Sequence, residues 1–411
     1  MKPQQPLHVV HVVASLAEAS GGPPRSVVSL CERLGALGCR VDIVTLENEH
    51  YFGPAVAHDP ALVTVHRVQS RYFKPLRLIS APGFAHALAR VAAGADVIHA
   101  HGIWLSVNHA AAQVARRLAV PHVISVRGNF LPAALASSAW KKKLARRFFV
   151  DADVRSAGCL HATSPDEARL IRGLGFKNPI AVLPAGVTLP GFPPEELSRR
   201  YAARWPELRG KRVLLFLGRV HPHKGIYYLA QAWAQLARQH PDWHLVVAGA
   251  DEIGCQQEAQ AQLAAAGGAG SCSFVGTVSG ADKWALLAHC GLLTLPSRSE
   301  NFGHAVAEAL AAGRPVLTTD TTPWADLERF QCGWRIPVGA AALQQKLSAV
   351  LALPAAELDA MGRRGIQLIQ TRYEATSVAR QMRGVYQWLA KRAERPACVE
   401  SPDGAPVSDP A

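Results

Sequence analysis

Residues 7–47 have the sequence LHVVHVVASLAEASGGPPRSVVSLCERLGALGCRVDIVTLE. The run Leu7–Val13 is apolar and rich in valine, as is typical of a strand buried on both faces of a parallel sheet. Apolar residues then recur at helical spacing up to Leu37, and Gly38 is the kind of residue that ends a helix. A second strand pattern follows over 40–46. The segment therefore predicts a β-α-β unit, whose crossover joins parallel strands.

The same alternation of strands and helices continues along the chain. Its 411 residues exceed what one hydrophobic core usually organises, so we expect two domains. The predicted fold class is α/β, with two Rossmann-like β/α/β domains facing a central cleft, because ligands of such folds bind beyond the carboxyl ends of the strands. Further strands are expected at 96–101, 121–126, 159–163, 180–183, 212–217, 244–249, 273–278, 291–297 and 315–320, and helices at 107–118, 165–173 and 226–239.

The domain boundary is expected where this alternation stops. Proline and glycine cluster over 188–208, which favours an inter-domain linker. We therefore place one Rossmann-like domain at 1–190 and a second at 205–371. A last helix is expected at about 372–393. The tail, 396–411, contains proline, serine and aspartate, and it is predicted to be disordered.

The composition restricts the partners and the compartment. A net charge of +13 indicates attraction to something anionic, such as a phosphorylated substrate, an anionic membrane surface or nucleic acid. No zinc-finger spacing, RNP signature or basic heptad region is present, so no nucleic acid partner is expected. The eight cysteines lack C-x-x-C spacing, which favours buried free thiols in a reducing compartment. The first apolar run is short and contains histidines, so it favours a strand over a signal peptide.

Two carboxylates stand out in residues 295–324, LPSRSENFGHAVAEALAAGRPVLTTDTTPW. A strand ends near Leu295, and a loop leads into a helix at about His304. Glu300 then lies in the loop and Glu308 on the helix, only ~6 Å along the axis from its start. Both carboxylates can therefore face one pocket at a helix N-terminus.

That helix N-terminus also provides an anion site. The backbone N–H groups of Phe302, Gly303 and His304 point to the same place, and such groups bind phosphates. A nucleotide sugar reconciles the two features, because its diphosphate takes the N–H groups while its hydroxyls donate to the carboxylates. The alternative is an ordinary helix cap made by Ser299 or Asn301.

A pair of cations follows an upstream strand, in LGRVHPHKG at residues 217–225. Arg219 and Lys224 are five residues apart at the end of this buried strand. Two cations at the top of a Rossmann sheet can hold a diphosphate and neutralise charge on a leaving group. The alternative is simple surface solvation.

Together the two motifs resemble those of the retaining glycosyltransferases of family four, of the bacterial surface-glycan type, which have the GT-B fold. The likeness lies in S-x-S-E-N-F-G-x-x-x-x-E-A-L-A-x-G-x-P-V at 297–316 and G-R-x-x-x-x-K-G at 218–225. It implies that the N-terminal domain binds the acceptor and the C-terminal domain the nucleotide-sugar donor. It also implies that the final helix crosses back onto the N-terminal domain.

The resemblance also implies roles for the donor residues. Arg219 and Lys224 would hold the donor diphosphate and Glu300 the donor sugar, with the backbone of Asn301–His304 beside it. Glu308 would hold the ribose. No metal and no cofactor are expected, because the family needs no metal, the donor half has no D-x-D-like cluster and the nucleotide sugar is a substrate.

His101 ends a strand of the first half in IHAHGIW, at the edge where a ligand would bind. The family usually has a histidine here, near the donor sugar and the acceptor hydroxyl; the alternative is a core or capping histidine. His99 lies on the same side of the strand, because side chains alternate. Arg127, in the next strand-to-loop segment SVRGNF, is expected on the acceptor side.

Gly21 and Gly22 follow the first strand and allow a ligand close to the backbone, which places them at the donor. They do not form G-x-G-x-x-G, so a nicotinamide dinucleotide is not expected. The family often has P-N-G-V-D after the first domain, whereas this chain has Pro-Ala-Gly-Val-Thr at 184–188. Contacts made by the missing asparagine and aspartate are therefore not carried over.

A basic stretch, WKKKLARRFF, occupies residues 140–149 of the first half. Its cations alternate with apolar residues, which fits contact with an anionic membrane surface or a lipid phosphate. A solvated helix face fits equally well, so both interpretations stay open.

These features predict a retaining, metal-independent, hexosyl-type glycosyltransferase. It would move a sugar from a UDP- or GDP-sugar to a glycan or lipid-linked glycan acceptor in cell-surface polysaccharide synthesis. The alternatives are a nucleotide-sugar epimerase of GT-B-like fold and a non-catalytic nucleotide-sugar-binding protein. A cytoplasmic location is expected, peripheral on the inner face of the plasma membrane if residues 140–149 bind lipid.

Overall fold

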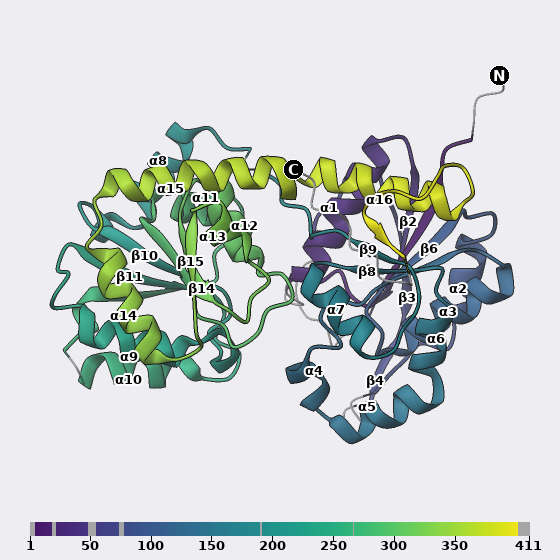
Figure 1. Cartoon of the computed structure of the whole chain (residues 1–411), viewed down its shortest axis with the longest axis horizontal. Helices are drawn as coiled ribbons and strands as arrows, with labels where there is room; N and C mark the ends of the chain where they lie inside the picture. The colour runs from purple at the N-terminus through teal and green to yellow at the C-terminus, as the bar shows by residue number, and fades with distance from the viewer. Residues whose placement is uncertain are drawn as a thin grey trace. The chain divides into compact units, whose positions relative to one another are not determined.

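The computed structural model describes residues 5–18, 22–47, 55–73, 78–189, 191–265 and 267–401. The chain divides into two compact units, each with its own sheet (Figure 1). Unit 1 combines Met1–Gly186 with Ala375–Ala411, and unit 2 is Val187–Glu374. The last part of the chain therefore belongs to the same unit as the first.

Unit 1 is built on an eight-stranded sheet in the order β16-β9-β8-β7-β6-β1-β2-β3. All neighbouring pairs are parallel except β16, which runs antiparallel to β9. The strands are β1 (His8–Val13), β2 (Arg40–Glu47), β3 (Thr64–Gln69), β6 (Val97–His101), β7 (His122–Ser125), β8 (Cys159–Ala162), β9 (Ile180–Val182) and β16 (Val399–Glu400). A separate hairpin pairs β4 (Arg71–Phe73) with β5 (Leu78–Ser80).

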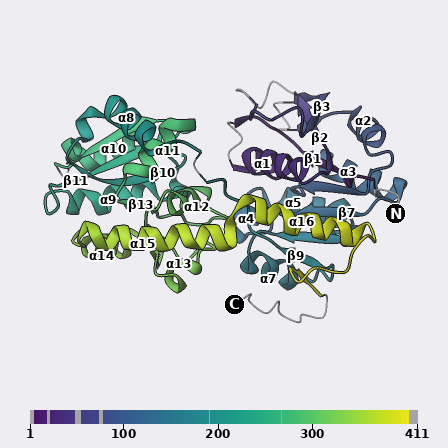
Figure 2. The same cartoon turned by 90° about the horizontal axis from the view of Figure 1, so that it is seen from above.

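Helices cover both faces of this sheet, which is why its central strands are buried along their whole length. Val9 and Val13 of β1 pack in a core with residues of α1 and α16, whereas Val10 and Val12 pack in a core with α2 and α3. Figure 2 shows α1 and α16 side by side. The helices of unit 1 are α1 (Gly22–Ala36), α2 (Phe84–Val91), α3 (Ser106–Leu118), α4 (Pro132–Ala136), α5 (Ala139–Ala145), a π-helical turn (Arg146–Val150), α6 (Asp151–Ser156), α7 (Pro165–Gly173) and α16 (Ala375–Leu389).

Unit 2 is built on a six-stranded parallel sheet in the order β12-β11-β10-β13-β14-β15. The strands are β10 (Arg212–Leu217), β11 (Trp243–Ala248), β12 (Cys272–Gly276), β13 (Leu292–Leu295), β14 (Val316–Thr319) and β15 (Gly333–Ile336). The helices are α8 (Pro194–Arg204), α9 (Ile226–Leu236), α10 (Cys255–Ala265), α11 (Gly280–His289), α12 (His304–Ala311), α13 (Asp326–Arg329), α14 (Ala340–Leu351) and α15 (Ala355–Leu368).

The predicted α/β class with two Rossmann-like halves is confirmed, but the predicted linker is wrong. Residues 188–208 contain α8, which belongs to unit 2 and packs against α11. Prolines are compatible with a first helical turn, where no N–H is needed, and Glu195 and Glu196 favour it through the helix dipole. The ring of Tyr201 stacks on His289 of α11, with centroids 4.5 Å apart.

The predicted disordered tail is also wrong in part. Val399 and Glu400 form β16, and Val399 is buried because it extends the sheet of unit 1 beside β9. Residues 402–411 lie outside the described residues. The last predicted helix is α16, which is shorter than expected. Helix α1 begins earlier than expected, at Gly22, with two prolines in its first turn.

The eight cysteines are all free, and six of them are buried. None of the helices in the described segments combines the length and the apolar character needed to cross a bilayer.

Candidate active site

In unit 2, the predicted donor residues follow two neighbouring strands. β10 and β13 pair in parallel, so their carboxyl ends lie at the same edge of the sheet. Arg219 and Lys224 follow β10, and Lys224 ends a short 3-10 turn that begins at Pro222. Glu300 follows β13 in the loop before α12. The sequence order strand, loop, helix therefore brings both motifs to one edge.

Lys224 and Glu300 form an ion pair at this edge. The Lys224 ammonium lies 2.5 Å from Oε1 of Glu300, and the Ser297 hydroxyl donates to the same oxygen at 2.7 Å. The side chain of Glu300 is 9% exposed and that of Lys224 22% exposed. Low exposure strengthens this interaction relative to a surface pair. The structure thus joins two residues that the sequence singled out separately.

Gly225 allows the two loops to pack this closely. Its φ is +78°, and a Cβ at this position would lie 2.0 Å from the carbonyl oxygen of Pro296. Only glycine tolerates both the left-handed conformation and the close approach. The K-G dipeptide therefore presses the Lys224 turn directly against the loop that holds Glu300.

Glu308 is held by a different lysine. Its carboxylate lies 2.7 Å from the ammonium of Lys283 on α11, and both side chains are mostly buried. No sequence signal marked Lys283, because α11 has no motif and the contact exists only in the folded unit. The two carboxylates are thus paired with separate cations.

Arg219 is the most solvent-exposed of the predicted donor residues that form ion pairs. Its guanidinium lies 3.1 Å from the carboxylate of Glu252, and the two side chains are 53% and 40% exposed. Between the two cations in sequence lies His221, whose pKa is lowered by burial, then by His223, Arg219 and Lys224. An exposed pair of this kind contributes little to stability, so Arg219 can exchange Glu252 for an anionic ligand at small cost.

Helix α12 begins at His304, as the sequence predicted, and Gly303 at its N-cap position has φ +81°. The N-cap position is thus taken by a glycine and not by Ser299 or Asn301. Trp324, which is fully buried, donates from Nε1 to the carbonyl of Phe302 at 2.5 Å. The indole therefore fixes the turn that contains Asn301, Phe302 and Gly303.

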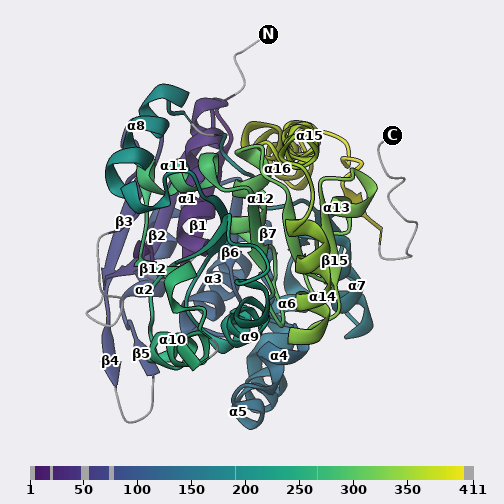
Figure 3. The same cartoon turned by 90° about the vertical axis from the view of Figure 1, so that its left-hand side faces the viewer.

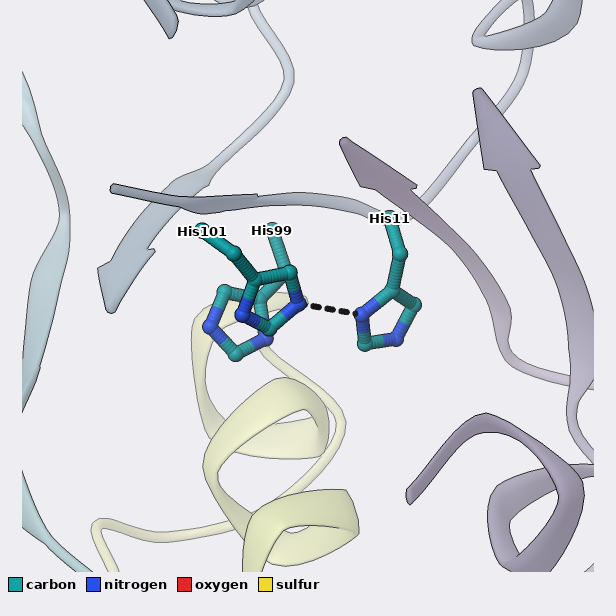
Figure 4. Close-up of side chains that lie close together, drawn as sticks. All are labelled: His11, His99 and His101. Atoms are coloured by element: carbon teal, nitrogen blue, oxygen red, sulfur yellow. Dashed lines mark hydrogen bonds between the residues drawn. The ribbon is translucent and has the colours of Figure 1, made fainter. Parts of the chain in front are cut away.

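In unit 1, His101 belongs to a cluster of three buried histidines on β1 and β6. His11 of β1 is in register with His99 of β6, and the ring centroids of His99 and His101 are 4.2 Å apart. Nδ1 of His11 and Nε2 of His101 are 3.0 Å apart, as the dashed line in Figure 4 shows. The prediction that His99 and His101 share one side of the strand is confirmed.

Arg127 is brought directly to His101. Its Nε donates to Nδ1 of His101 at 3.2 Å, and its Nη1 donates to the hydroxyl of Ser26 at 3.0 Å. Its φ is +52°, in the left-handed region. The next residue is fixed by the buried carboxylate of Glu167, which accepts the N–H of Gly128 at 2.5 Å. The loop after β7 is therefore held in the conformation that places Arg127.

A second chain of hydrogen bonds runs through His99, and its direction follows from its ends. The carbonyl of Leu183 can only accept, so His161 donates to it from Nε2 and accepts from the Ser125 hydroxyl at Nδ1. Ser125 then accepts from Nε2 of His99, at 2.6 Å. Nδ1 of His99 is left to accept from the phenol of Tyr386, at 2.5 Å. Because burial keeps both histidines neutral by lowering their pKa values, each carries its single proton on Nε2.

The same reasoning fixes His101. Its Nδ1 accepts from Arg127, so its proton lies on Nε2 and is donated to Nδ1 of His11. The remaining proton of His11 is on Nε2, which has no hydrogen-bond partner within the described segments. His101 is thus a neutral, oriented ring in a polar cluster and not an apolar core histidine.

Burial keeps these rings neutral. It lowers the pKa of His11 to about 3 and that of His161 to about 4, and the pKa values of His99 and His101 fall well below 6.5. The charge of Arg127 acts in the same direction. Burial also lowers the pKa of Arg127, to about 10, so it is still cationic at neutral pH. The cluster therefore presents one cation and several neutral rings.

The three histidines are also the one group in the described segments that could supply several ligands to a metal. One nitrogen from each of His11, His99 and His101 lies within 4.8 Å of the others. Both nitrogens of His99 are already hydrogen-bonded, and the Arg127 guanidinium would repel a cation beside His101. The donor set therefore fits a hydrogen-bonded chain better than a metal ion.

The glycines predicted at the donor are only partly described. Gly22 is the first residue of α1 in unit 1, and Gly21 lies outside the described residues. Unit 1 ends at Gly186, within the segment 184–188 that departs from the family pattern. A Cβ on Gly186 would lie 2.7 Å from Cα of Ala375. This glycine is therefore needed where the chain passes the start of α16.

Several site residues were missed because they come from elements with no motif. His11, Ser125 and His161 share one signal that could have revealed them: each is a polar residue near the carboxyl end of an apolar strand, in register with a neighbour of the same kind. Lys283 and Tyr386 lie on helices distant in sequence, and no local pattern marks them.

Two parallel Rossmann-like sheets, a lysine–glutamate pair beside a helix N-terminus in one and an oriented histidine in the other are the features of GT-B glycosyltransferases. Comparison of the sequence with known families agrees. Residues 199–367 match the glycosyl transferases group 1 model, and residues 21–186 match the glycosyl transferase 4-like domain. The protein belongs to this family of glycosyltransferases.

Its relatives differ in what their names say they act on. The chain is 32% identical over 325 residues to a D-inositol 3-phosphate glycosyltransferase of Nocardioides sp., covering 72% of this chain and 70% of the relative. It is 26% identical to a GDP-mannose:cellobiosyl-diphosphopolyprenol alpha-mannosyltransferase of Xanthomonas oryzae pv. oryzae, covering 78% of this chain and 80% of the relative. Among solved structures, Anabaena HepE in complex with UDP and glucose superposes with a TM-score of 0.71 at 17% identity, covering 92% of this chain and 99% of HepE. That likeness concerns the fold.

Proposed function

We propose that the protein is a retaining, metal-independent glycosyltransferase of the hexosyl type. It transfers the sugar of a UDP- or GDP-sugar to a glycan or lipid-linked glycan acceptor in cell-surface polysaccharide synthesis. The observation that supports this most is the Lys224–Glu300 pair next to the N-terminus of α12. A cation and a helix N-terminus suit a diphosphate, and a carboxylate suits sugar hydroxyls.

The names of similar proteins support a nucleotide-sugar donor. The Xanthomonas relative is named for GDP-mannose and for an acceptor on diphosphopolyprenol, and HepE was solved with UDP-glucose as well as with UDP. Because these donors carry different bases, both UDP- and GDP-sugars belong to the proposal. The polyprenol acceptor of the Xanthomonas relative favours a lipid-linked acceptor here.

In the proposed reaction, the acceptor oxygen bonds to the anomeric carbon on the face from which the diphosphate departs. The bond from that carbon to the phosphate oxygen breaks, and the acceptor proton moves to the departing diphosphate. Lys224 and Arg219 stabilise the negative charge on the diphosphate, together with the N–H groups that begin α12. Glu300 orients the donor sugar and Glu308 the ribose. These fixed charges replace what a metal ion would supply.

Unit 1 supplies the acceptor side in this proposal. His101 is neutral and its orientation is fixed by Arg127, so it can exchange its bond with His11 for one with a hydroxyl. Arg127 adds a cation for an acceptor phosphate. The low pKa of His101 makes it a hydrogen-bonding group at neutral pH and not a positive charge.

The proposal is tested by calorimetric titration with UDP and GDP, each with magnesium and with EDTA. We expect one nucleotide to bind equally in both buffers, and Lys224→Ala and Arg219→Ala to weaken that binding at least tenfold. Arg209→Ala, an exposed cation of the same unit with no ion pair in the described segments, is the matched control. Binding that requires magnesium contradicts the metal-independent site.

The alternatives predict other outcomes. An epimerase releases free nucleotide from the donor without any acceptor, whereas a binding protein leaves the donor intact when donor and acceptor are both present. With a lipid-linked glycan acceptor, the proposed enzyme forms a product whose anomeric proton coupling in NMR matches that of the donor. A coupling typical of the opposite anomer would exclude the retaining mechanism.

A further inference from the structure

A ridge of exposed apolar side chains lies on α5 and the π-helical turn after it. Trp140 is 70% exposed, Leu144 52% and Phe148 72%. Five large hydrophobic residues are exposed in the described segments, and three of them form this ridge. Their spacing of four residues places them on one side of the helix. Such a cluster marks an interaction surface, whereas single exposed apolar residues do not.

The opposite side of the same segment is firmly held. Lys142 donates to the carbonyl of Ala134, and its ammonium lies 5.4 Å from the ring centre of Trp104. The guanidinium of Arg146 lies 2.8 Å from Asp151, and Val150 is buried. Two of the five cations of the basic stretch thus have structural partners. The ridge is therefore presented by a fixed helix.

The other three cations flank the ridge. Lys141, Lys143 and Arg147 are exposed, and none of them forms an ion pair with a carboxylate in the described segments. An apolar ridge bordered by unpaired cations is complementary to a surface that has an apolar interior and an anionic outer layer. A protein partner would need an apolar groove lined with acidic residues, whereas a phospholipid bilayer has both properties by composition.

We propose that Trp140, Leu144 and Phe148 insert into the interfacial region of a bilayer that contains anionic phospholipids, while Lys141, Lys143 and Arg147 bind its headgroups. Tryptophan favours this depth because its amphipathic ring meets both water and acyl chains, and phenylalanine favours it because its apolar ring contacts the acyl chains. Each cation near an anionic surface strengthens binding about fivefold. The inference stands on these six side chains and does not depend on the donor chemistry.

The position of the ridge in unit 1 suits a membrane contact. Helix α5 packs mainly on its neighbours α4 and the π-helical turn, and in Figure 3 it lies at the lower margin of its unit. The segment is reached from the end of β7 through the loop that contains Arg127.

The test is flotation with vesicles of pure phosphatidylcholine and of phosphatidylcholine mixed with phosphatidylglycerol. The ridge variant combines Trp140→Ser, Leu144→Ser and Phe148→Ser; the charge variant combines Lys141→Gln, Lys143→Gln and Arg147→Gln. We expect the wild type to bind the anionic vesicles and both variants to lose about a hundredfold or more in affinity. Raising the salt concentration should weaken the binding of the wild type to anionic vesicles, whereas the weak binding of the charge variant should change little.

Matched controls remove the same kinds of group elsewhere. Ile253→Ser removes an exposed apolar residue of unit 2, and Arg117→Gln with Lys177→Gln and Arg209→Gln removes three exposed cations. Both controls should bind vesicles like the wild type. Equal losses in the controls would show that net charge alone attracts the protein, which would overturn the proposal.

A second measurement reports insertion directly. Brominated lipids should quench tryptophan emission of the wild type, and Trp140→Phe should remove most of that quenching without weakening binding much. Unchanged quenching in Trp140→Phe, or vesicle binding that survives in the ridge variant, contradicts the proposal. The proposal is also contradicted if the wild type does not bind vesicles but forms a dimer, and the ridge variant is a monomer. Nucleotide titration of the ridge variant separates this outcome from a failure of the proposed function, because the ridge variant leaves unit 2 unchanged.

Discussion

Tyr386 of α16 donates a hydrogen bond of 2.5 Å to Nδ1 of His99 in β6, although 287 positions separate them in sequence. The two residues meet because α16 packs beside α1 on the face of the sheet to which the odd-numbered residues of β1 and β6 point. The chain that starts at the Leu183 carbonyl and runs through His161 and Ser125 places the proton of His99 on Nε2, and the phenol donates to the nitrogen that is left. The last helix therefore supplies the final donor of a hydrogen-bonded chain built on the first strands.

Tyr386→Phe should leave the last acceptor of this chain without a donor. The buried Nδ1 of His99 loses its hydrogen bond, which should lower the free energy of unfolding by about 1–3 kcal/mol. The ¹⁵N spectrum of His99 should show an Nδ1 that has lost its hydrogen bond, while Nε2 stays protonated because the Leu183 carbonyl still directs the chain. Tyr228→Phe, which removes an exposed phenol that accepts from Arg298, is the control and should change neither measurement. A proton that moves to Nδ1 of His99 in Tyr386→Phe would refute the directed chain.

Glu300→Gln and Lys224→Gln should each reduce turnover by about 10²–10³-fold, because each removes a fixed charge at the reacting group. Stability should change less than activity, because the partner that remains keeps a contact: Lys224 is 22% exposed to water, and Glu300 still accepts from the Ser297 hydroxyl. Steady-state kinetics and urea unfolding measure the two effects. Arg200→Gln removes an exposed ion pair with Glu196 on α8 and should leave both near wild type. Turnover within a few-fold of wild type for Glu300→Gln would remove this residue from the site.

Gly225→Ala should destabilise unit 2 by more than its backbone conformation alone requires. Gly38→Ala is the matched comparison, because Gly38 has a similar φ of +81° but no atom within 4 Å of the point where a Cβ would lie. A left-handed alanine costs about 1–2 kcal/mol, and overpacking against Pro296 adds about 1–3 kcal/mol. Thermal or urea unfolding measures both variants. Equal losses would mean that the loops after β10 and β13 separate without cost.

The buried histidines make stability depend on pH. Burial lowers the pKa values of His11 and His122 to about 3 and that of His161 to about 4, against 6.5 when unfolded. Between these values the unfolded chain binds more protons, so the stabilisation is complete above pH 6.5 and is lost as the pH falls below it. Each histidine contributes a slope of up to ~1.4 kcal/mol per pH unit. Urea unfolding between pH 7 and about 5 measures the sum, above the range where most carboxylates titrate.

His122→Leu isolates one of these contributions. Neither ring nitrogen of His122 has a hydrogen-bond partner in the described segments, so leucine removes a titrating group without breaking a bond. The slope of stability against pH should decrease by the contribution of one histidine, up to ~1.4 kcal/mol per pH unit. His86→Asn, on the exposed face of α2, should leave the slope unchanged. A wild-type stability that stays flat from pH 7 to pH 5 would contradict the burial of these rings as neutral groups.

The sequence predicted the strands well because a strand buried on both faces is mostly apolar, and β1, β10 and β11 are. It failed over 188–208 because prolines before α8 were taken as the end of regular structure, whereas proline is also common in a first helical turn. It failed at β16 because two residues contain no periodicity. A strand this short forms only because β9 offers an open edge.

The candidate site divides in the same way. His101 ends a strand, and Lys224, Glu300 and Arg127 lie in the segments that follow strands, so the order of elements was enough to place them. Their partners could not be foreseen from local patterns. The ammonium of Lys283 reaches Glu308 from another helix, and which lysine pairs with which carboxylate depends on how α11 packs on α12. The hydrogen-bond directions around His99 needed a carbonyl, that of Leu183, as their starting point.

Unit 1 combines segments that precede and follow unit 2 in the sequence, and this affects the order in which the two units can fold on the ribosome. Strand β9 gains its neighbour β16, and His99 gains its donor, only after all of unit 2 has been synthesised. Unit 2 is continuous and can complete its core first, even though unit 1 begins to emerge earlier. A nascent chain therefore exposes an unfinished first sheet for most of its synthesis. The hydrogen-bonded chain at His99 is complete only once α16 has been synthesised, so a chain that stops before α16 lacks this part of the candidate site.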